Sequence, residues 1–117
     1  MSGKVVLVCG DRNWTNKEII RWELKKFPVG TLIVNGACRG ADMIADEIAR
    51  ELGLDVWRFP AQWDKYGRAA GPIRNKEMLV RAKPDLVIAF HNNIEKSKGT
   101  KHMITIAKEA RVEVILV

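Results

Sequence analysis

The chain has 117 residues, of which 47% are hydrophobic and 29% are charged, a balance typical of one soluble globular domain with its own core. No apolar run approaches the length of a membrane span, and the run VVLV near the start is too brief for a signal peptide. We therefore predict a single domain over residues 1–117, a cytoplasmic location and no membrane partner. The net charge of +6 indicates an anionic partner, either nucleic acid or a phosphorylated small molecule.

The two cysteines, Cys9 and Cys38, do not have the spacing of metal ligands. In a reducing compartment they are expected to be buried thiols. We predict no metal site and no cofactor.

In the first half of the chain, short apolar runs alternate with helical patterns. The β-branched run at 4–9 (KVVLVC) is typical of a strand buried on both faces. Thr15 is expected to cap a helix that ends at Phe27, ahead of Pro28 and Gly30. The elements expected next are a strand at 32–34, a helix from Ala41 to Leu52 that Gly53 ends, and a strand at 55–59.

The second half repeats this alternation after a polar loop at 61–71. Pro72 is expected to open a helix that ends near Ala82, because proline is favoured in the first helical turn. The elements expected after it are a strand at 86–90, a loop at 91–99, a helix from Thr100 to about Ala110 with Thr100 as its cap, and a strand at 112–117.

Strands that alternate with helices to the end of the chain predict an α/β fold, a mostly parallel five-stranded sheet with helices on both faces. Right-handed crossovers leave two strand orders, 3-2-1-4-5, which we favour, and 2-1-3-4-5. In either order, ligands bind beyond the carboxyl ends of the strands, where the strand order reverses.

Glycine, arginine, asparagine and aspartate gather in the segments that follow the strands. Glycines allow a backbone to approach a phosphate, helix N-termini attract anions, and arginines bind phosphate through two parallel hydrogen bonds. Tryptophans can stack on a base. The predicted ligand-binding residues are Gly10, Arg12, Trp14, Gly36, Arg39, Gly40, Asp42, Trp63, Gly71, Arg74, Asn75, His91, Gly99 and Thr100.

Individual residues have simpler interpretations as well. Asp42 near a helix start can merely complement the helix dipole, and a glycine pair in a turn can merely be tight. Trp22 and Trp57 are expected to pack in the core or between helices, and His102 to lie on the surface. The glycine spacings match neither the dinucleotide fingerprint nor the P-loop.

Four segments together resemble the SLOG superfamily in its YspA-like branch: CGDRNW, NGACRGAD, FPAQWDKYGRAAGPIRN and VIAFHNNIEKSKGT. The superfamily includes the Lonely Guy phosphoribohydrolases and the DprA single-stranded-DNA-binding proteins. The resemblance implies a Rossmann-like fold that binds nucleotides, nucleotide-derived signals or nucleic acid. It covers nearly the whole chain.

The resemblance also implies roles for single residues. Gly36, Arg39, Gly40 and Asp42 match the second motif, and Gly71, Pro72, Arg74 and Asn75 match the third, where the hydrolases place a catalytic arginine. The hydrolases have a glutamate three residues beyond the threonine of their glycine-rich loop. Here Gly99 and Thr100 remain, but residue 103 is methionine.

We therefore predict a module that binds a phosphorylated nucleoside or nucleotide-derived molecule, as a sensor or handler of such signals. The first alternative is an enzyme that cleaves a nucleotide N-glycosidic bond, with Asp42 and Arg74 as catalytic residues and Asp11 as another possible carboxylate. The second is a nucleic-acid-binding protein, which the positive charge favours. The sequence is compatible with a monomer and with a homo-oligomer.

Overall fold

The computed structural model describes residues 4–117. The five strands are β1 (Val5–Gly10), β2 (Leu32–Asn35), β3 (Asp55–Arg58), β4 (Leu86–Phe90) and β5 (Glu113–Leu116). The α-helices are α1 (Lys17–Leu24), α2 (Ala41–Glu51), α3 (Trp63–Tyr66), α4 (Ala70–Ala82) and α5 (Gly99–Glu109). Two short 3₁₀ turns, η1 (Gly67–Ala69) and η2 (Ile94–Lys96), precede α4 and α5 respectively.

The strands form one parallel sheet in the order β3-β2-β1-β4-β5, which confirms the favoured prediction. The alternative order is excluded because β1 pairs with both β2 and β4. Gly10 and Phe90 are partners in register at the ends of β1 and β4. β2 and β3 lie on one side of β1, and β4 and β5 lie on the other, so the strand order reverses between β1 and β4. The ends of these two strands therefore mark the expected ligand crevice.

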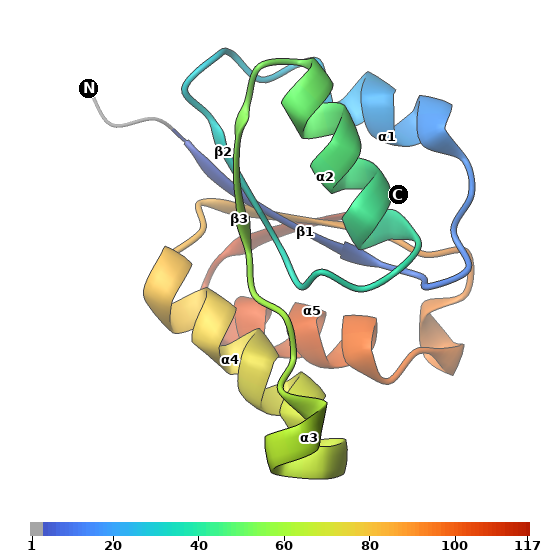
Figure 1. Ribbon diagram of the computed structural model, residues 1–117, viewed down its shortest axis with the longest axis vertical. Coiled ribbons are helices and arrows are strands. Elements are labelled where there is room, and N and C mark those ends of the chain that lie inside the picture. Colours follow the sequence, from blue (N-terminus) through green and yellow to red (C-terminus); the bar gives the residue numbers. More distant parts are fainter. Residues whose placement is uncertain (1–3) are drawn as a thin grey trace.

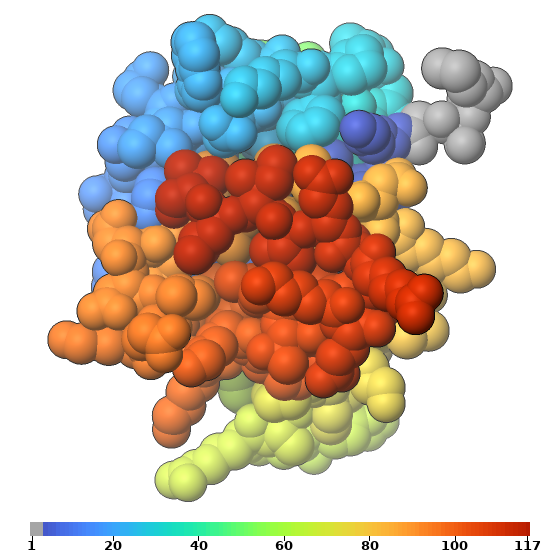
Figure 2. Space-filling view, turned by 180° about the vertical axis from the view of Figure 1, so that it is seen from behind, coloured from blue at the N-terminus to red at the C-terminus, as the bar shows by residue number. Residues whose placement is uncertain are grey.

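The sheet lies between two pairs of helices, with α1 and α2 on one face and α4 and α5 on the other (Figure 1). Ile20 of α1 and Ile48 of α2 belong to one hydrophobic cluster, whereas Met78 of α4 and Met103 of α5 belong to the second. Seen from behind, α5 and β5 cover much of the surface (Figure 2). The layers explain why the strands β1 and β4 are apolar along almost their whole length.

Several predicted helix ends were wrong by one to three residues. Asn16, rather than Thr15, caps α1, because its Oδ1 accepts from the Ile19 N–H at 3.2 Å. The helix ends at Leu24 instead of Phe27. The helix expected from Pro72 begins at Ala70, and α3 and η1 occupy most of the expected loop at 61–71.

The start of α5 also differs from the prediction. Gly99 is its first residue, so Thr100 lies buried in the first turn and does not cap the helix. The capping hydrogen bond comes from Ser97, whose Oγ accepts from the Thr100 N–H at 3.0 Å.

Two side chains have surroundings that differ from those expected. Trp22 was expected to be packed, but it is 58% exposed and the Lys25 ammonium lies 4.1 Å from its ring centroid. His102 was expected at the surface, but it is half-buried with Nδ1 3.2 Å from the Asn75 amide nitrogen. The spacing of residues along a helix shows which side chains share a face, but it does not show which other segments of the chain cover that face.

Within residues 4–117, no helix has both the length and the apolar character needed to cross a membrane.

Candidate functional site

A cavity of about 420 Å³ lies at the carboxyl ends of β1 and β4, and we call it the first cavity. It is lined by Arg39 from the loop between β2 and α2, by Arg74 from α4 and by Thr100 from the first turn of α5. The other residues that line it are Cys9, Gly10, Asp11, Arg12, Asn13, Cys38, Asp42, Asn75, Met78, His91, Lys96, Ser97, Lys98 and Gly99. The site therefore lies where the topology predicts a ligand crevice.

A second cavity, of about 490 Å³, adjoins the first. The two share a wall made of Arg12, Cys38, Arg39 and Arg74. The second cavity is completed by small or apolar residues, namely Gly36, Ala37, Pro60, Ala61 and Trp63. Beyond the shared wall, the first cavity is thus mainly polar, whereas the second is lined by small and apolar residues.

The glycine-rich loop between β2 and α2 binds a carboxylate of its own chain. Asp42 Oδ2 accepts from the Gly36 N–H at 2.9 Å and, more weakly, from the Cys38 N–H at 3.4 Å. A Cβ added to Gly36 would collide with the Arg74 guanidinium and lie 3.0 Å from Asp42 Oδ2. The glycine at this position therefore serves the packing of Asp42 and Arg74 against the loop.

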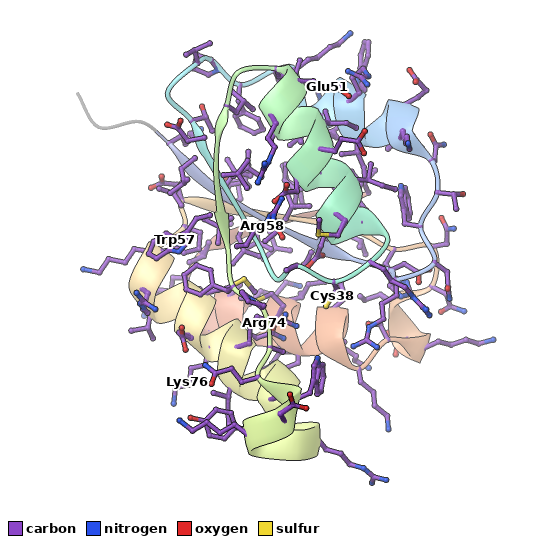
Figure 3. The ribbon with its side chains drawn as sticks, in the orientation of Figure 1. Cys38, Glu51, Trp57, Arg58, Arg74 and Lys76 are labelled. Atoms are coloured by element: carbon purple, nitrogen blue, oxygen red, sulfur yellow. The ribbon has the colours of Figure 1, made fainter. Side chains whose placement is uncertain are left out.

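Arg74 also binds this loop. Its Nη1 donates to the Gly36 carbonyl and, at 3.4 Å, to the Phe59 carbonyl, and its Nε donates to Asn75 Oδ1 at 2.9 Å. The guanidinium also lies 3.7 Å from Cys38 Sγ, and the two side chains are seen close together in Figure 3. Arg74 thus shapes the wall between the cavities and joins α4 to the β2–α2 loop.

The carboxyl group of Asp42 keeps its proton more readily than an ordinary aspartate. Burial raises its pKa from 3.8 to about 6, although Arg74 and the N–H groups of Cys38 and Gly36 oppose the change. A carboxyl group with this pKa is partly protonated near neutral pH, and Asp42 lines the first cavity. Acids with such a pKa can exchange protons with a bound molecule.

Burial and the nearby Asp42 raise the pKa of the Cys9 thiol far above its ordinary range. Cys9 therefore stays protonated and is a poor nucleophile. It is buried as predicted, whereas Cys38 is only half-buried.

The loop after β1 is held by close backbone contacts. The Asp11 carbonyl accepts from the Trp14 and Ala41 N–H groups, each at 3.1 Å, and its Oδ1 accepts from the Asn13 N–H at 2.9 Å. A Cβ at Gly10 would collide with the Phe90 carbonyl and with the Ala41 side chain. Gly10 therefore allows the start of α2 to lie against the end of β1.

Gly40 likewise serves a close approach of the chain to itself. It has φ +81°, and a Cβ there would collide with the Asp11 and Arg12 carbonyls. In the first turn of α2, the Ala41 N–H donates to Asp11 and the Met43 N–H to Cys38. These donors are no longer free for an anion, so α2 is a weaker phosphate site than its sequence suggested.

Three of the predicted ligand-binding residues line neither cavity. Trp14 is 7% exposed, packs against Phe90 with ring centroids 5.7 Å apart and belongs to the core. Gly40 faces the β1 loop, and Gly71 lies behind Trp63, whose Cη2 would be 3.4 Å from a Cβ at that position. The predicted residues that do line one or both cavities are Gly10, Arg12, Gly36, Arg39, Asp42, Trp63, Arg74, Asn75, His91, Gly99 and Thr100.

The ligand-binding residues predicted from the sequence did not include several polar residues of the first cavity. Lys96, Ser97 and Lys98 precede α5 and contribute two cations and the hydroxyl that caps the helix. The spacing of Ser97 three residues before Thr100 is a capping signal that could have identified this segment. Among residues 4–117, no three His, Cys, Asp or Glu side chains are close enough to hold a metal ion.

The likeness to known structures agrees with this fold. DNA processing protein A (DprA) from Streptococcus pneumoniae superposes with a TM-score of 0.72 at 17% sequence identity, over 97% of this chain. The chain spans half (50%) of the length of that protein, and at this identity the likeness shows the fold alone.

The sequence comparisons identify relatives. Gene 61 protein of Mycobacterium phage D29 is 38% identical over 120 residues, which cover 94% of this chain and 93% of that protein. The family model of the YspA, cpYpsA-related SLOG family matches residues 4–66, more than half of the chain and including the motifs after β1 and β2. From these matches and the parallel sheet with its crevice, we conclude that the chain belongs to the YspA, cpYpsA-related SLOG family.

Proposed function

We propose that the chain binds a phosphorylated nucleoside or another nucleotide-derived small molecule in the first cavity. One observation carries the proposal: the cations Arg12, Arg39, Arg74, Lys96 and Lys98 surround a crevice whose acidic residues are Asp11 and Asp42. Both carboxylates accept hydrogen bonds from the surrounding loops. The excess of positive charge favours an anionic ligand.

Arg39 is the side chain best placed to bind a phosphate. Arg39 and Arg12 are both exposed and line both cavities, but the Arg12 guanidinium lies over the Trp63 ring. The Arg74 guanidinium already donates to two carbonyls and to Asn75. Guanidinium groups bind phosphate oxygens through paired, charge-assisted hydrogen bonds. We therefore assign the main phosphate contact to Arg39 and a shaping role to Arg74.

Calorimetric titration with nucleoside 5′-monophosphates and with the matching nucleosides tests the proposal. The monophosphates are expected to bind and the nucleosides to bind much more weakly. Arg39→Gln should weaken monophosphate binding by about tenfold, the effect of one lost charge-assisted hydrogen bond. Arg111→Gln is the matched control, because Arg111 is exposed and lines neither cavity.

The titration also separates this proposal from nucleic-acid binding. A protein that binds a nucleic acid through many phosphates loses affinity steeply as salt concentration rises. Tight binding of a single-stranded oligonucleotide with such a salt dependence, and no binding of monophosphates, would replace our proposal with a nucleic-acid interface.

A second candidate function is cleavage of a nucleotide N-glycosidic bond. It is favoured by Asp42, a cavity-lining carboxyl group whose pKa of about 6 suits proton transfer to a departing base. Met103 is fully buried and cannot supply this proton. Chromatography of incubated monophosphates tests the idea. Free base released by the wild type but not by Asp42→Asn, with binding retained by the variant, would support the enzyme over the binding module.

A further inference from the structure

The second cavity has walls suited to a flat, uncharged group. Apart from the arginines that it shares with the first cavity, it is lined by small and apolar residues and by Trp63. The phosphate-binding Arg39 lies on the shared wall. A ligand with an anionic end in the first cavity can therefore place its other end against the apolar surface of the adjoining second cavity.

Trp63 offers that surface in a defined position. It is the first residue of α3, and its indole ring lies beside Gly71 at the start of α4, where a Cβ would be 3.4 Å away. Trp63 as a whole is 47% exposed. One edge of the indole therefore lies beside Gly71 of α4, while nearly half of the surface of Trp63 stays open to solvent.

Arg12 covers the indole only loosely. The Arg12 guanidinium carbon lies 5.8 Å from the ring centroid, close to the outer limit of about 6 Å for a cation–π contact. The Arg12 side chain is exposed and lines both cavities. A planar group can displace it from the ring at little cost while Arg12 turns to the anionic part of the same ligand.

We propose that Trp63 is a stacking platform for the base of the bound nucleotide, which lies in the second cavity while its phosphate is held by Arg39 on the shared wall. The inference rests on the proposed function and extends it to the base. Bases of every kind have a face that stacks on aromatic side chains, so this platform favours nucleotides over sugar phosphates without selecting one base.

Trp22 provides a natural comparison for the test. It is also an exposed tryptophan next to a cation, with the Lys25 ammonium 4.1 Å from its ring centroid, but it lines neither cavity. Trp22→Leu therefore removes an exposed indole without touching the site. Any general effect of losing an exposed indole on fluorescence or stability will show in this variant.

The experiment measures calorimetric affinity and tryptophan fluorescence with adenosine 5′-monophosphate and with ribose 5-phosphate, which has no base. For the wild type, we expect both probes to bind, the nucleotide more tightly, and only the nucleotide to quench fluorescence. Trp63→Leu should bind ribose 5-phosphate as the wild type does, and should bind the nucleotide about tenfold more weakly with the quenching abolished. Trp63→Phe, which keeps a stacking ring, should recover most of the nucleotide affinity, and Trp22→Leu should behave as the wild type.

The outcomes distinguish the two proposals. If both probes bind but Trp63→Leu keeps the nucleotide affinity and the quenching, the stacking platform is wrong and the phosphate site stands. Binding of neither probe to the wild type would overturn the proposed function and the platform with it. Equal weakening of both probes in Trp63→Leu would also overturn the platform, because it would mean that α3 supports the phosphate site rather than the base.

Discussion

Asp42 and Asp46 lie one turn apart on α2, and their side chains are almost completely buried, with the residues 5% and 1% exposed. Asp46 is surrounded by cations and donors: Arg58 donates to both of its oxygens at 2.8 Å, the Asn35 amide donates at 3.0 Å, and Arg50 lies 3.0 Å away. Figure 3 shows Arg58 extending from β3 on the side of α2. Asp42 instead accepts from two backbone N–H groups beside a cavity.

The two surroundings move the acidities in opposite directions. Hydrogen bonds from Arg58 lower the pKa of Asp46, and Asn35 adds to the effect. Burial raises the pKa of Asp42 to about 6. Asp46 is therefore a structural anion that joins α2 to β2 and β3, whereas Asp42 is a carboxyl group poised to gain or lose a proton at the ligand crevice. The difference arises because only Asp46 receives charged hydrogen bonds strong enough to offset its burial.

The largest expected effect comes from removing the structural anion. Asp46→Ala leaves the fully buried Asn35 amide and two arginines without their acceptor. We expect the free energy of unfolding to fall by about 3 kcal/mol, the lower part of the range for a broken buried ion pair, because both guanidinium groups reach solvent. Urea unfolding measures it. Nucleotide affinity should stay unchanged, and a large loss of affinity would contradict the separation of structure from site.

The stability of the protein is expected to depend on pH through Asp42 and Asp46. Because the pKa of Asp42 is raised in the folded state, its contribution to stability is present below pH 4 and is lost as the pH rises to about 6. The loss amounts to about 2–3 kcal/mol for this change of pKa. Asp46 has the opposite sign: its contribution is present above pH 4 and is lost as the pH falls.

The pH effect is isolated by subtracting the unfolding free energies of Asp42→Asn from those of the wild type between pH 4 and pH 7. Asparagine keeps an oxygen for the Gly36 N–H but does not titrate. The difference in unfolding free energy between the wild type and Asp42→Asn should change between pH 4 and pH 7 and should level off above pH 7. A flat difference would show that the environment of Asp42 does not disfavour its charge.

Two glycine substitutions at the crevice are expected to differ in their effect on stability. Gly36→Ala forces its Cβ against the Arg74 guanidinium and Asp42, and should cost about 2 kcal/mol through overpacking. Gly99→Ala is the matched control, because nothing lies within 4 Å of its Cβ position, and its stability should stay within about 0.5 kcal/mol of the wild type. Thermal unfolding compares the two variants. Equal melting temperatures would mean that the Asp42 and Arg74 side chains move away from the added Cβ at little cost.

The smallest effect tests how much the exposed partner contributes to the Asp46 network. The Arg50 side chain is more than half exposed, and its ion pair spans one helical turn. Arg50→Gln should therefore lower the free energy of unfolding by only about 0.5 kcal/mol. A loss of unfolding free energy close to that of Asp46→Ala would mean that Arg50, and not Arg58, is the main partner of Asp46.

Much of the fold was decided by local patterns. The β-branched runs, the helical spacing of apolar residues and the glycines after helices placed all five strands and the four main helices. The rule for parallel sheets then placed the crevice and brought Arg39, Arg74 and Thr100 to it. Helix ends were less certain because the neighbouring residues Thr15 and Asn16 are both favourable N-caps, and the geometry of the chain selects one of them.

The roles of single side chains were decided by contacts between distant segments. Arg74 donates to a carbonyl 38 residues earlier, and Asp46 binds Arg58 twelve residues later. Such pairings set the proton affinity of Asp42 and the purpose of Gly36, since desolvation and close packing depend on what lies nearby in space. Sequence by itself determined which residue types reach the crevice. Only the tertiary structure decided which of them hold the loops and which are left to bind a ligand, because a donor already satisfied by the protein is no longer available to a partner.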